Sequence, residues 1–554
     1  CVFNVNQNGG LNILLQYLTY SANIVRGNKD KITIFRECFS VNVLAWFKNM
    51  NNSALTKILK LSLMAFCAWY ISAFAYIALS RAGYAFELEW MEGSMADHIR
   101  ILSCAGNIYA APSLDFVPFI YAPLYYAICY PAALLSGNAL FAMRLVSLLS
   151  FGLTLFLIYK WVFKETGVAA YSFYFVALFT ACFEVCGAWY DIARVDSLAL
   201  LLIMSFFYIL RFGRFKYNQV IAALMLTLAC MCKQSNIVAA APLIIFLAFQ
   251  DFKKHIPLIS ISALSLVCAV FYLNYRSDYL FGYYAYYLPS MHAIDKSLIA
   301  GFWFGDLLPK IPFLIILSAF FLIKLYFIKS ADFLFYSSLA FGMVLSSWLA
   351  RIHEGGYLNV LMPACAVFSL LAVTALKYMS GSFSFKLNFN NANTAEAKSD
   401  SAGHNILPFV YAVLAAQFLL LLYNPALYIP SDDDLAAGRR LVDKIKSFKG
   451  EVYVPYHPYL VLAAGKSGPA AHHMAVFDIL RADKDGINYK LINEAVSGYI
   501  ESKKAEAIIL DNLNFTHIEL VKKFYSLKSL IFEGGVFYPV CGMRTRPQYL
   551  FVRK

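Results

Sequence analysis

The sequence predicts a polytopic α-helical membrane protein with a small α/β domain at its C-terminal end. Of its 554 residues, 60% are hydrophobic and 14% are charged, whereas soluble domains carry roughly 25% charged residues. Apolar runs that approach the length of a bilayer span recur from residue 58 to residue 424 and are separated by short basic gaps. Beyond residue 429 the pattern changes to amphipathic helices and short strands.

The net charge of +13 is explained by membrane topology. Many Lys and Arg residues lie in the short gaps between apolar runs, as expected for the cytoplasmic side of a membrane protein. Nucleic-acid binding would require a basic face or a groove-binding module, and the sequence shows neither.

The first residues are expected to lie outside the folded domains. They begin with Cys1 and have only a weak apolar pattern, while Met50 stands just before a strong apolar run, as a bacterial start would. We therefore predict that residues 1–54 are a disordered or mis-assigned N-terminal extension.

About eleven spanning helices are expected in a membrane domain of residues 55–428. A spanning helix needs about 20 mostly apolar residues. The candidates are 58–80, 139–160, 168–186, 192–210, 218–232, 236–250, 256–274, 307–328, 331–350, 357–377 and 406–424. The pair 218–232 and 236–250 is short and has basic flanks, which favours a hairpin with Lys233-Gln234-Ser235 at its outer tip.

Charge fixes the expected orientation of these helices. If the N-terminus is cytoplasmic, every inner connection is basic, and this is what the positive-inside rule requires. The first outer loop, residues 81–138, then lies outside together with the C-terminal domain, residues 429–554. The loop 378–405 lies inside, and its Asn, Ser and Ala content predicts a flexible cytoplasmic linker.

The C-terminal domain is predicted from its periodicity. Residues 431–448 and 490–502 have a helical period, and residues 451–455, 506–511 and 548–552 are typical of short strands. A small α/β domain outside the membrane follows.

Candidate chemistry begins in the first outer loop, whose residues 84–126 are acidic and then aromatic. Glu87, Glu89, Glu92 and Asp97 lie close together, and carboxylates near lipid are costly enough to suggest a function. Desolvation would raise a carboxyl pKa towards the range that a general base needs. An ordinary solvated acidic loop is the alternative. The aromatic end of the segment, residues 119–131, is expected to be an interfacial lid or lipid-docking segment.

Two later outer turns and the hairpin tip carry further charges. Residues 189–202 supply Asp191, Arg194 and Asp196 at the start of an apolar helix, where Asp191 could also be a helix cap and a charge pair could face a cavity. Residues 348–363 supply Arg351, His353, Glu354, Tyr357 and Asn359 around Gly355-Gly356. Lys233 either extends to the interface or meets an anionic headgroup.

A carboxylate base beside cations suits transfer of a group from a phosphorylated lipid to a hydroxyl acceptor. Arg194, Lys233 and Arg351 are the cations that would hold the phosphate. Two alternatives stay open: a flippase or transporter of a lipid-linked or anionic substrate, and a non-catalytic assembly factor that acts through its C-terminal domain. No cofactor is expected, although Asp191 with Asp196 could hold a divalent ion.

The order of these features resembles the GT-C superfamily of membrane glycosyltransferases. The matching segments are EGSMADHIRILSCAGNIYAAP (92–112), FIYAPLYY (119–126), Arg144 in the second span, ARVDSLALLL (193–202), CKQS (232–235) and GGYLNVLMP (355–363). The layout is most similar to the bacterial branch that is related to protein O-mannosyltransferases and the lipid A aminoarabinose transferase.

The resemblance implies a transferase of the bacterial inner membrane that uses a polyprenyl-phosphate sugar and inverts the anomeric centre. Its partners would be this donor, a glycan, lipid or protein acceptor, and the bilayer, without nucleic acid. The matching catalytic base is Glu92, with Glu89 as the second choice, because Met91 stands where the family often has Asp. The residues expected to bind donor or substrate are Arg194, Lys233, Gln234, Arg351, Asp191, Asp196, His98, Arg100, Tyr121, His353, Tyr357 and Asn359.

Overall fold

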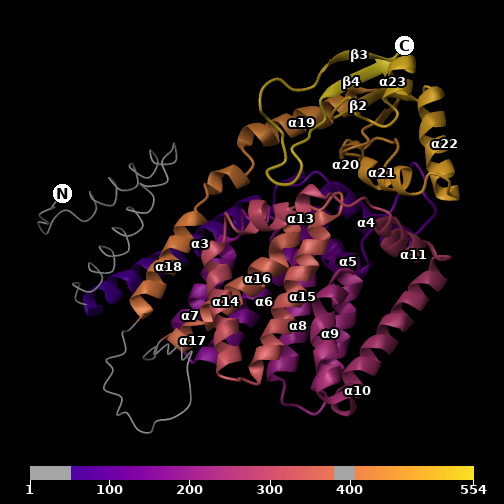
Figure 1. Ribbon diagram of the computed structural model, residues 1–554. Coiled ribbons are helices and arrows are strands. Elements are labelled where there is room, and N and C mark those ends of the chain that lie inside the picture. The colour runs from indigo at the N-terminus through magenta and orange to yellow at the C-terminus, as the bar shows by residue number, and fades with distance from the viewer. Residues whose placement is uncertain (1–51, 380–405) are drawn as a thin grey trace, which may run out of the picture.

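The structure is a computed structural model that describes residues 52–379 and 406–554. Residues 1–51 of the predicted extension and residues 380–405 of the predicted inner loop lie outside the described residues. The described chain forms a helical bundle with an α/β part at one end (Figure 1). This end of the bundle is called the domain end below.

Long apolar helices make up the bundle. Helix ends follow local signals: α6 begins after Asn138, whose side chain accepts a hydrogen bond from Phe141 N, and ends at Gly167 in the left-handed conformation (φ 71°). The bundle helices are α3 (Asn52–Ala82), α6 (Ala139–Thr166), α7 (Ala169–Ala181), α8 (Asp196–Phe212), α9 (Asn218–Cys232), α10 (Asn236–Arg276), α14 (Pro312–Phe327), α15 (Asp332–Ile352), α16 (Met362–Thr374) and α18 (Leu407–Leu420).

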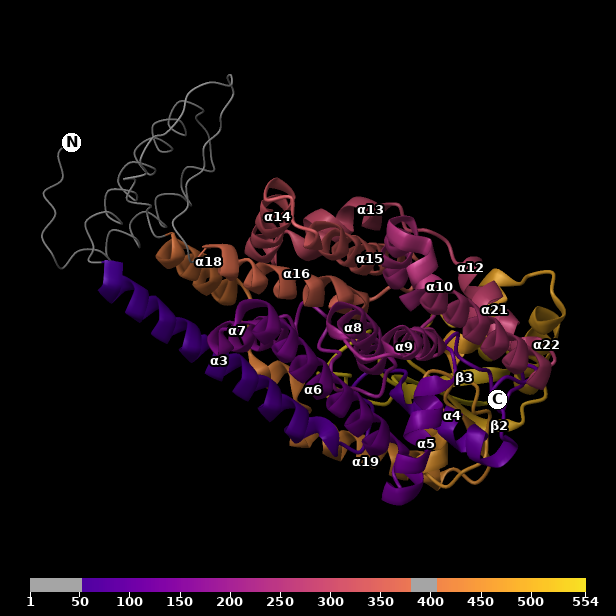
Figure 2. The ribbon, with the colours of Figure 1, turned by 90° about the horizontal axis from the view of Figure 1, so that it is seen from below.

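Seen from below, α3 runs along the edge of the bundle beside α7 and α6, and α8 lies in the middle between α6 and α9 (Figure 2). Shorter elements connect these helices. They are α4 (Glu92–Ala105), α5 (Leu124–Ser136), α11 (Leu280–Gly282), α12 (Leu288–Ser290), α13 (Ser297–Gly301), α17 (Leu376–Met379), the π-helical turns Tyr283–Tyr287 and Phe302–Leu307, and the 3₁₀ turns Leu358–Leu361 and Pro425–Tyr428.

The expected number of eleven spans is not confirmed. Within the described ranges, five helices are long and apolar enough to cross a membrane, or up to seven if each of two bent helix pairs is one span. Three further apolar helices, α5, α7 and α9, have only 13 to 15 residues. Residues 182–195, which the sequence assigned partly to two spans, form buried turns instead, so the helices on either side are shorter than expected.

The predicted hairpin is present. Helix α9 ends at Cys232 and α10 begins at Asn236, so Lys233, Gln234 and Ser235 form the turn between them. Helix α10 is broken at Asp251, where the backbone leaves the helical region (φ −160°, ψ 88°). This break falls between the two predicted spans 236–250 and 256–274.

The C-terminal part contains a four-stranded sheet of order β1-β2-β4-β3. Strands β1 (Glu451–Tyr453) and β2 (Ala505–Leu510) are parallel, and β4 (Tyr549–Arg553) runs antiparallel to β2 and to β3 (Tyr525–Leu530). The sequence predicted all but β3, an edge strand whose residues are mostly exposed. The helices are α19 (Asp432–Ser447), α20 (Tyr459–Ala463), α21 (His473–Ala482), α22 (Ile487–Glu501) and α23 (Ile518–Phe524).

The first outer loop lies beneath this C-terminal part. Phe86 packs in a small core with Phe537 and with apolar residues of α19, β1 and β2. The backbone N–H of Cys541 donates to the carbonyl of Leu88 at 3.1 Å. The acidic segment is therefore enclosed between the bundle and the C-terminal part and is not a solvated loop, since Glu87, Glu89, Glu92 and Asp97 are all buried.

Candidate functional site

Glu92 is fully buried and accepts four hydrogen bonds. Nε and Nη2 of Arg144 on α6 donate to its two carboxylate oxygens at 3.1 and 2.6 Å. The backbone N–H groups of Leu88 and Ala193 donate to the same two oxygens, both at 2.7 Å. Burial raises the pKa of Glu92, but Arg144 and the two N–H groups outweigh burial and hold this pKa below its usual value.

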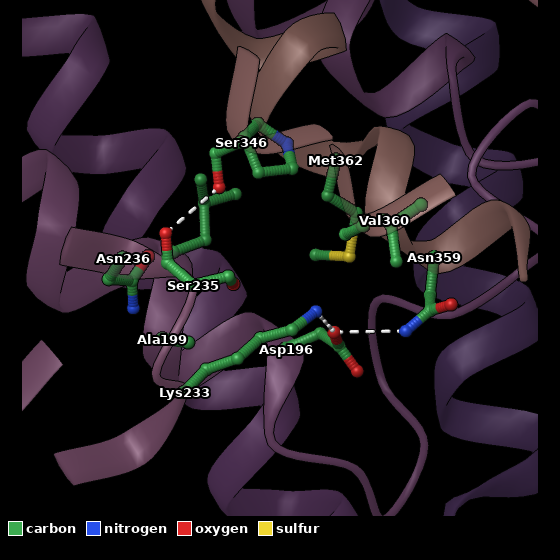
Figure 3. A pocket seen from close by; sticks show the side chains of 12 residues that line it. Asp196, Ala199, Lys233, Ser235, Asn236, Ser346, Asn359, Val360 and Met362 are labelled. Atoms are coloured by element: carbon green, nitrogen blue, oxygen red, sulfur yellow. Dashed lines mark hydrogen bonds and ion pairs between the residues drawn. The ribbon is translucent and has the colours of Figure 1, made fainter. Parts of the chain in front are cut away.

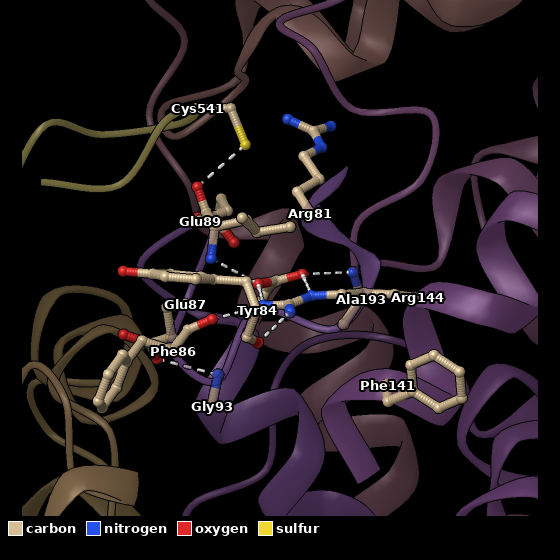
Figure 4. Close-up of polar contacts among 12 residues, drawn as sticks. Arg81, Tyr84, Phe86, Glu87, Glu89, Gly93, Phe141, Arg144, Ala193 and Cys541 are labelled. Atoms are coloured by element: carbon tan, nitrogen blue, oxygen red, sulfur yellow. Dashed lines mark hydrogen bonds and ion pairs between the residues drawn. The ribbon is translucent and has the colours of Figure 1, made fainter. Parts of the chain in front are cut away.

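These contacts argue against Glu92 as the general base, which was the first choice from the sequence. A carboxylate has about four acceptor positions, and here all four are used. Figure 4 shows this set, in which Arg144 and Ala193 converge on the acidic segment. Glu92 joins the first outer loop to α6 and to the turn before α8, so its role in the geometry is to anchor that loop.

Glu89 has the properties that a base requires. It is 1% exposed and lies in the turn before α4, so it does not share a helical face with Glu92 as the spacing suggested. Its Oε2 accepts from Arg194 Nη1 at 3.0 Å and from the Met91 N–H at 3.3 Å. Burial, opposed by Arg194 and reinforced by Glu92, raises the pKa of Glu89 to about 7. A carboxyl with this pKa exchanges protons at neutral pH.

Arg194 lies between two aromatic rings. Its guanidinium carbon is 5.4 Å from the ring centre of Tyr121 and 5.3 Å from that of Trp189. Nη2 donates to the Tyr121 hydroxyl at 2.6 Å, whereas the buried Nε has no hydrogen-bond partner among the described residues. A buried guanidinium with an N–H left over can bind a phosphate oxygen.

Asp196, the first residue of α8, collects three donors at the mouth of a cleft (Figure 3). Its Oδ1 accepts from Lys233 Nζ at 2.6 Å and from Asn359 Nδ2 at 3.0 Å, and its Oδ2 accepts from Trp189 Nε1 at 3.0 Å. The other residues that line the cleft include Ala199, Leu200, Val360, Met362 and Pro363. A cation beside apolar walls suits an amphiphilic anion.

Trp189 joins the two groups of charges. Its ring packs against Arg194 and against Tyr357, whose ring centre is 5.2 Å away, and its N–H holds Asp196. The side chains of Glu89, Arg194, Trp189, Asp196 and Lys233 therefore form one continuous row, called the charged row below. Sequence reasoning missed Trp189, although it opens the segment 189–202 that supplies Arg194 and Asp196.

Arg351 and His353 do not join the charged row. The guanidinium of Arg351 is already paired with Asp306: Nε donates to Oδ2 at 2.8 Å and Nη2 donates to Oδ1 at 3.4 Å. Its Nη1 donates to the Gly356 carbonyl at 2.5 Å. Arg351 is not among the residues that line the cleft. His353 pairs through its backbone with Ile294 in an isolated bridge. Both residues shape the turn that carries Tyr357 and Asn359.

Asp191 and Gln234 also serve structural contacts. Arg81, at the end of α3, donates to both oxygens of Asp191 at 2.8 and 2.5 Å, and both side chains are buried. Gln234 Nε2 donates to the carbonyls of Ile120 and Ala285 at 2.9 Å each, which ties the hairpin tip to two other segments. The sequence gave no signal for the Arg81–Asp191 pair, because its members are 110 residues apart.

His98 and Arg100 lie on α4 away from the charged row. The His98 ring is stacked against Phe119 and Tyr126, and its Nε2 accepts the Phe119 N–H at 2.9 Å. Burial lowers the pKa of His98 to about 4, so the ring is neutral. Arg100 is half-exposed and pairs with Asp97 at 2.5 Å. His98 therefore packs against the aromatic part of the first outer loop, whereas Arg100 pairs within α4.

The geometry gives no support for a metal ion between Asp191 and Asp196. Each of these carboxylates faces a cation, Arg81 in one case and Lys233 in the other. Residues 52–379 and 406–554 contain no group of three or more His, Cys, Asp or Glu side chains that could hold a metal ion. A reaction without a cofactor stays a prediction.

Comparison with solved structures places the fold. ArnT from Cupriavidus metallidurans in the apo state matches with a TM-score of 0.55 and 12% identity over 88% of this chain and 97% of that one. The same protein bound to undecaprenyl phosphate matches with a TM-score of 0.53 and 12% identity over 87% and 97% of the two chains. The apo oligosaccharyltransferase of Archaeoglobus fulgidus matches with a TM-score of only 0.45 and 11% identity, over 83% of this chain and 73% of that one. No family model and no curated protein matches the sequence.

The fold and the charged row together define a membrane-embedded helical protein whose buried charges are gathered at the domain end of the bundle. The resemblance to the GT-C superfamily that the sequence indicated is confirmed at the level of the fold, since ArnT shares it across nearly the whole of both chains. At 12% identity the likeness concerns the fold alone, so the activity is argued separately.

Proposed function

We propose that this protein transfers a sugar from a polyprenyl-phosphate donor to a hydroxyl acceptor, with inversion, at the outer face of a bacterial inner membrane. The observation that carries the proposal is the charged row. A buried carboxyl with a pKa near 7 is connected through Arg194 and Trp189 to a cleft that combines a lysine with apolar walls. The fold it shares with a protein solved with undecaprenyl phosphate supports the same donor class.

The cleft suits the donor because both parts of a lipid phosphate find a matching surface. The phosphate would lie on Lys233, which lines the cleft. Arg194 does not line the cleft, and its unpartnered Nε would add a contact where the sugar phosphate extends along the charged row. The first prenyl units would contact apolar side chains such as Leu200 and Val360. Lys233 already pairs with Asp196, so Asp196 would keep the ammonium group in place while a phosphate oxygen accepts a hydrogen bond from one of its remaining N–H groups.

The reaction follows from these positions. Glu89 takes the proton of the acceptor hydroxyl, and the oxygen attacks the anomeric carbon from the face opposite the phosphate. The bond between the anomeric carbon and the phosphate oxygen breaks, which inverts the centre and releases the polyprenyl phosphate. Lys233 and Arg194 stabilise the charge that develops on the leaving phosphate, and preplaced charges of this kind usually supply the largest part of a rate enhancement.

Glu89 is preferred to Glu92 because the two carboxylates have opposite electrostatic environments. Arg144 and two N–H groups keep Glu92 ionised and occupied. Glu89 has one side-chain partner, Arg194, and a raised pKa. Protonation of Glu89 would leave Arg194 as a cation next to the leaving phosphate, which favours the transition state.

Purified protein in liposomes with a labelled undecaprenyl-phosphate sugar and a hydroxyl acceptor tests the proposal. We expect release of undecaprenyl phosphate with formation of a glycoside of inverted anomeric configuration, measured by mass spectrometry and NMR. Movement of intact donor across the bilayer without turnover would instead indicate a flippase. A protein that neither turns over nor moves any of a panel of sugar donors would refute the assignment.

A further inference from the structure

A buried histidine of the C-terminal part, His457, contacts the acidic segment at Glu87, whereas Glu92 joins the same segment to the bundle. His457 Nδ1 contacts Oε2 of Glu87, two residues before Glu89, and its Nε2 contacts Asp511 Oδ2 at 2.8 Å. Thr545 Oγ1 donates to the same oxygen of Asp511 at 2.6 Å. The His457, Glu87 and Asp511 side chains are each less than 5% exposed. The mechanism above uses none of them.

Both ring nitrogens of His457 face carboxyl oxygens. Each nitrogen faces a carboxylate, so the doubly protonated ring satisfies both contacts. Burial lowers the pKa of His457, but Asp511 and Glu87 outweigh it and raise this pKa to about 10. Burial also raises the pKa of Glu87 to about 8, against the opposing charge of His457, so Glu87 and His457 share protons near neutral pH. The contacts themselves bridge the Glu87 carboxyl of the first outer loop and the Asp511 carboxyl that follows strand β2.

The contacts around this bridge reach Glu89 directly. The second oxygen of Glu87 accepts the Gly93 N–H at 2.9 Å, and Gly93 lies so close to the Tyr459 ring that a Cβ would be 2.2 Å from it. On the other side of the segment, Gly542 has a φ of +75°, and a Cβ there would lie 2.6 Å from Glu89 Cγ. The backbone of the C-terminal part is thus packed against the segment on both sides of Glu89.

We propose that His457 is a positioning residue: its bridge between Glu87 and Asp511 holds residues 87–93 in the conformation that presents Glu89 to Arg194. The C-terminal part then completes the site. This inference rests on the proposed function, because it assigns His457 to the placement of the proposed base. Residues 87–93 are then held at two points. Glu92 pairs with Arg144 of the bundle, and Glu87 pairs with His457 of the C-terminal part.

Cys541 offers a test that does not depend on activity. Its Sγ is buried and lies 3.2 Å from the carbonyl of Leu88, the residue between Glu87 and Glu89 in the sequence. Alkylation of Cys541, followed by peptide mass spectrometry, reports how often the C-terminal part separates from the segment. The variants are His457→Asn and Glu87→Gln. His517→Asn is the matched control, because His517 is also buried in the same part and contacts Asn493 at 3.0 Å.

We expect alkylation of Cys541 to become on the order of tenfold faster in His457→Asn and in Glu87→Gln, and unchanged in His517→Asn. In the double variant of His457 and Glu87, Cys541 should be alkylated no faster than in the faster of the two single variants. Both single variants already remove the contact between His457 and Glu87. In the transfer assay kcat should fall by about tenfold or more in both variants, whereas the affinity for undecaprenyl phosphate should stay within about twofold of wild type.

The outcomes separate the two proposals. A folded His457→Asn protein with wild-type protection of Cys541 and wild-type kcat overturns the role of His457. Equal loss of donor affinity and kcat also overturns it, because the effect would then be a general loss of structure. If the wild-type protein transfers no sugar, the proposed function fails, and the alkylation rates still decide whether His457 holds the segment.

Discussion

The two neighbouring glutamates predict opposite outcomes when each is changed to glutamine. Glu92→Gln removes the charge that neutralises Arg144, whose side chain is 1% exposed. Loss of one partner from a buried ion pair costs about 3–5 kcal/mol. The new amide nitrogen would also face donors, because each carboxylate oxygen of Glu92 accepts one bond from Arg144 and one from a backbone N–H. Glu92→Gln should therefore be strongly destabilised.

Glu89→Gln should leave the fold nearly intact. With a pKa of about 7, Glu89 is close to half protonated at neutral pH, so a neutral side chain costs less than about 1 kcal/mol there. The amide oxygen can still accept from Arg194. Transfer should nevertheless fall by roughly 10²–10⁴-fold, the usual contribution of a general base.

The assay measures both quantities on the same samples. Thermal unfolding in detergent, followed by tryptophan fluorescence, gives the stability of each variant, and turnover of labelled donor gives kcat. Asp97→Asn serves as a control for the loss of a buried carboxylate in the same loop, since Asp97 pairs only with the half-exposed Arg100. A Glu92→Gln protein as stable as wild type but inactive, together with an active Glu89→Gln protein, would refute the assignment of the base.

Four further predictions follow from the charged row and its surroundings. Lys233→Ala should weaken binding of undecaprenyl phosphate by roughly 10–100-fold in a titration, and Lys233→Arg should keep most of it; equal affinities in all three proteins would contradict the phosphate role. Arg351→Gln should leave that affinity unchanged and lower the unfolding temperature, because Asp306 loses its partner. The value of kcat/KM should rise with pH through about 7 and level off above it, since Glu89 acts as a base only after losing its proton; a flat profile across this range would exclude Glu89. Trp189→Phe keeps an aromatic ring but removes the N–H that holds Asp196. Donor affinity should therefore fall a few-fold, without the large loss of transfer expected for Glu89→Gln.

Much of the fold follows from local patterns in the sequence. The hairpin tip at Lys233, the break in α10 and three of the four strands were predicted, because each rests on a run of apolar residues or on its interruption. The buried turns 182–195 were not predicted. They are nearly as apolar as the helices around them, so composition alone does not distinguish a buried turn from a helix end.

The site was predicted less completely, because pairing between distant residues leaves no local signal. The sequence placed Arg194, Lys233 and Asp196 at one end of the bundle, and topology sufficed for that. It did not show that Arg351 is occupied by Asp306, 45 residues away. Nor did it show that the C-terminal part supplies His457 to Glu87, across 370 residues.

The crowding of three glutamates within six residues explains why the base could not be chosen from the sequence. Each glutamate is matched by a cation from a different element: Glu92 by an arginine of α6, Glu89 by Arg194 from the turn before α8, and Glu87 by His457. Mutual repulsion would disorder such a segment unless all three cations were in place. Among the two carboxylates at the bundle, Glu92 has its charge compensated by four donors, whereas Glu89 has one side-chain donor at 3.0 Å and keeps a pKa near 7. Under the proposed function, incomplete compensation of Glu89 is therefore the property that leaves a proton acceptor in the charged row, and Glu87 and Glu92 on either side of it hold it there.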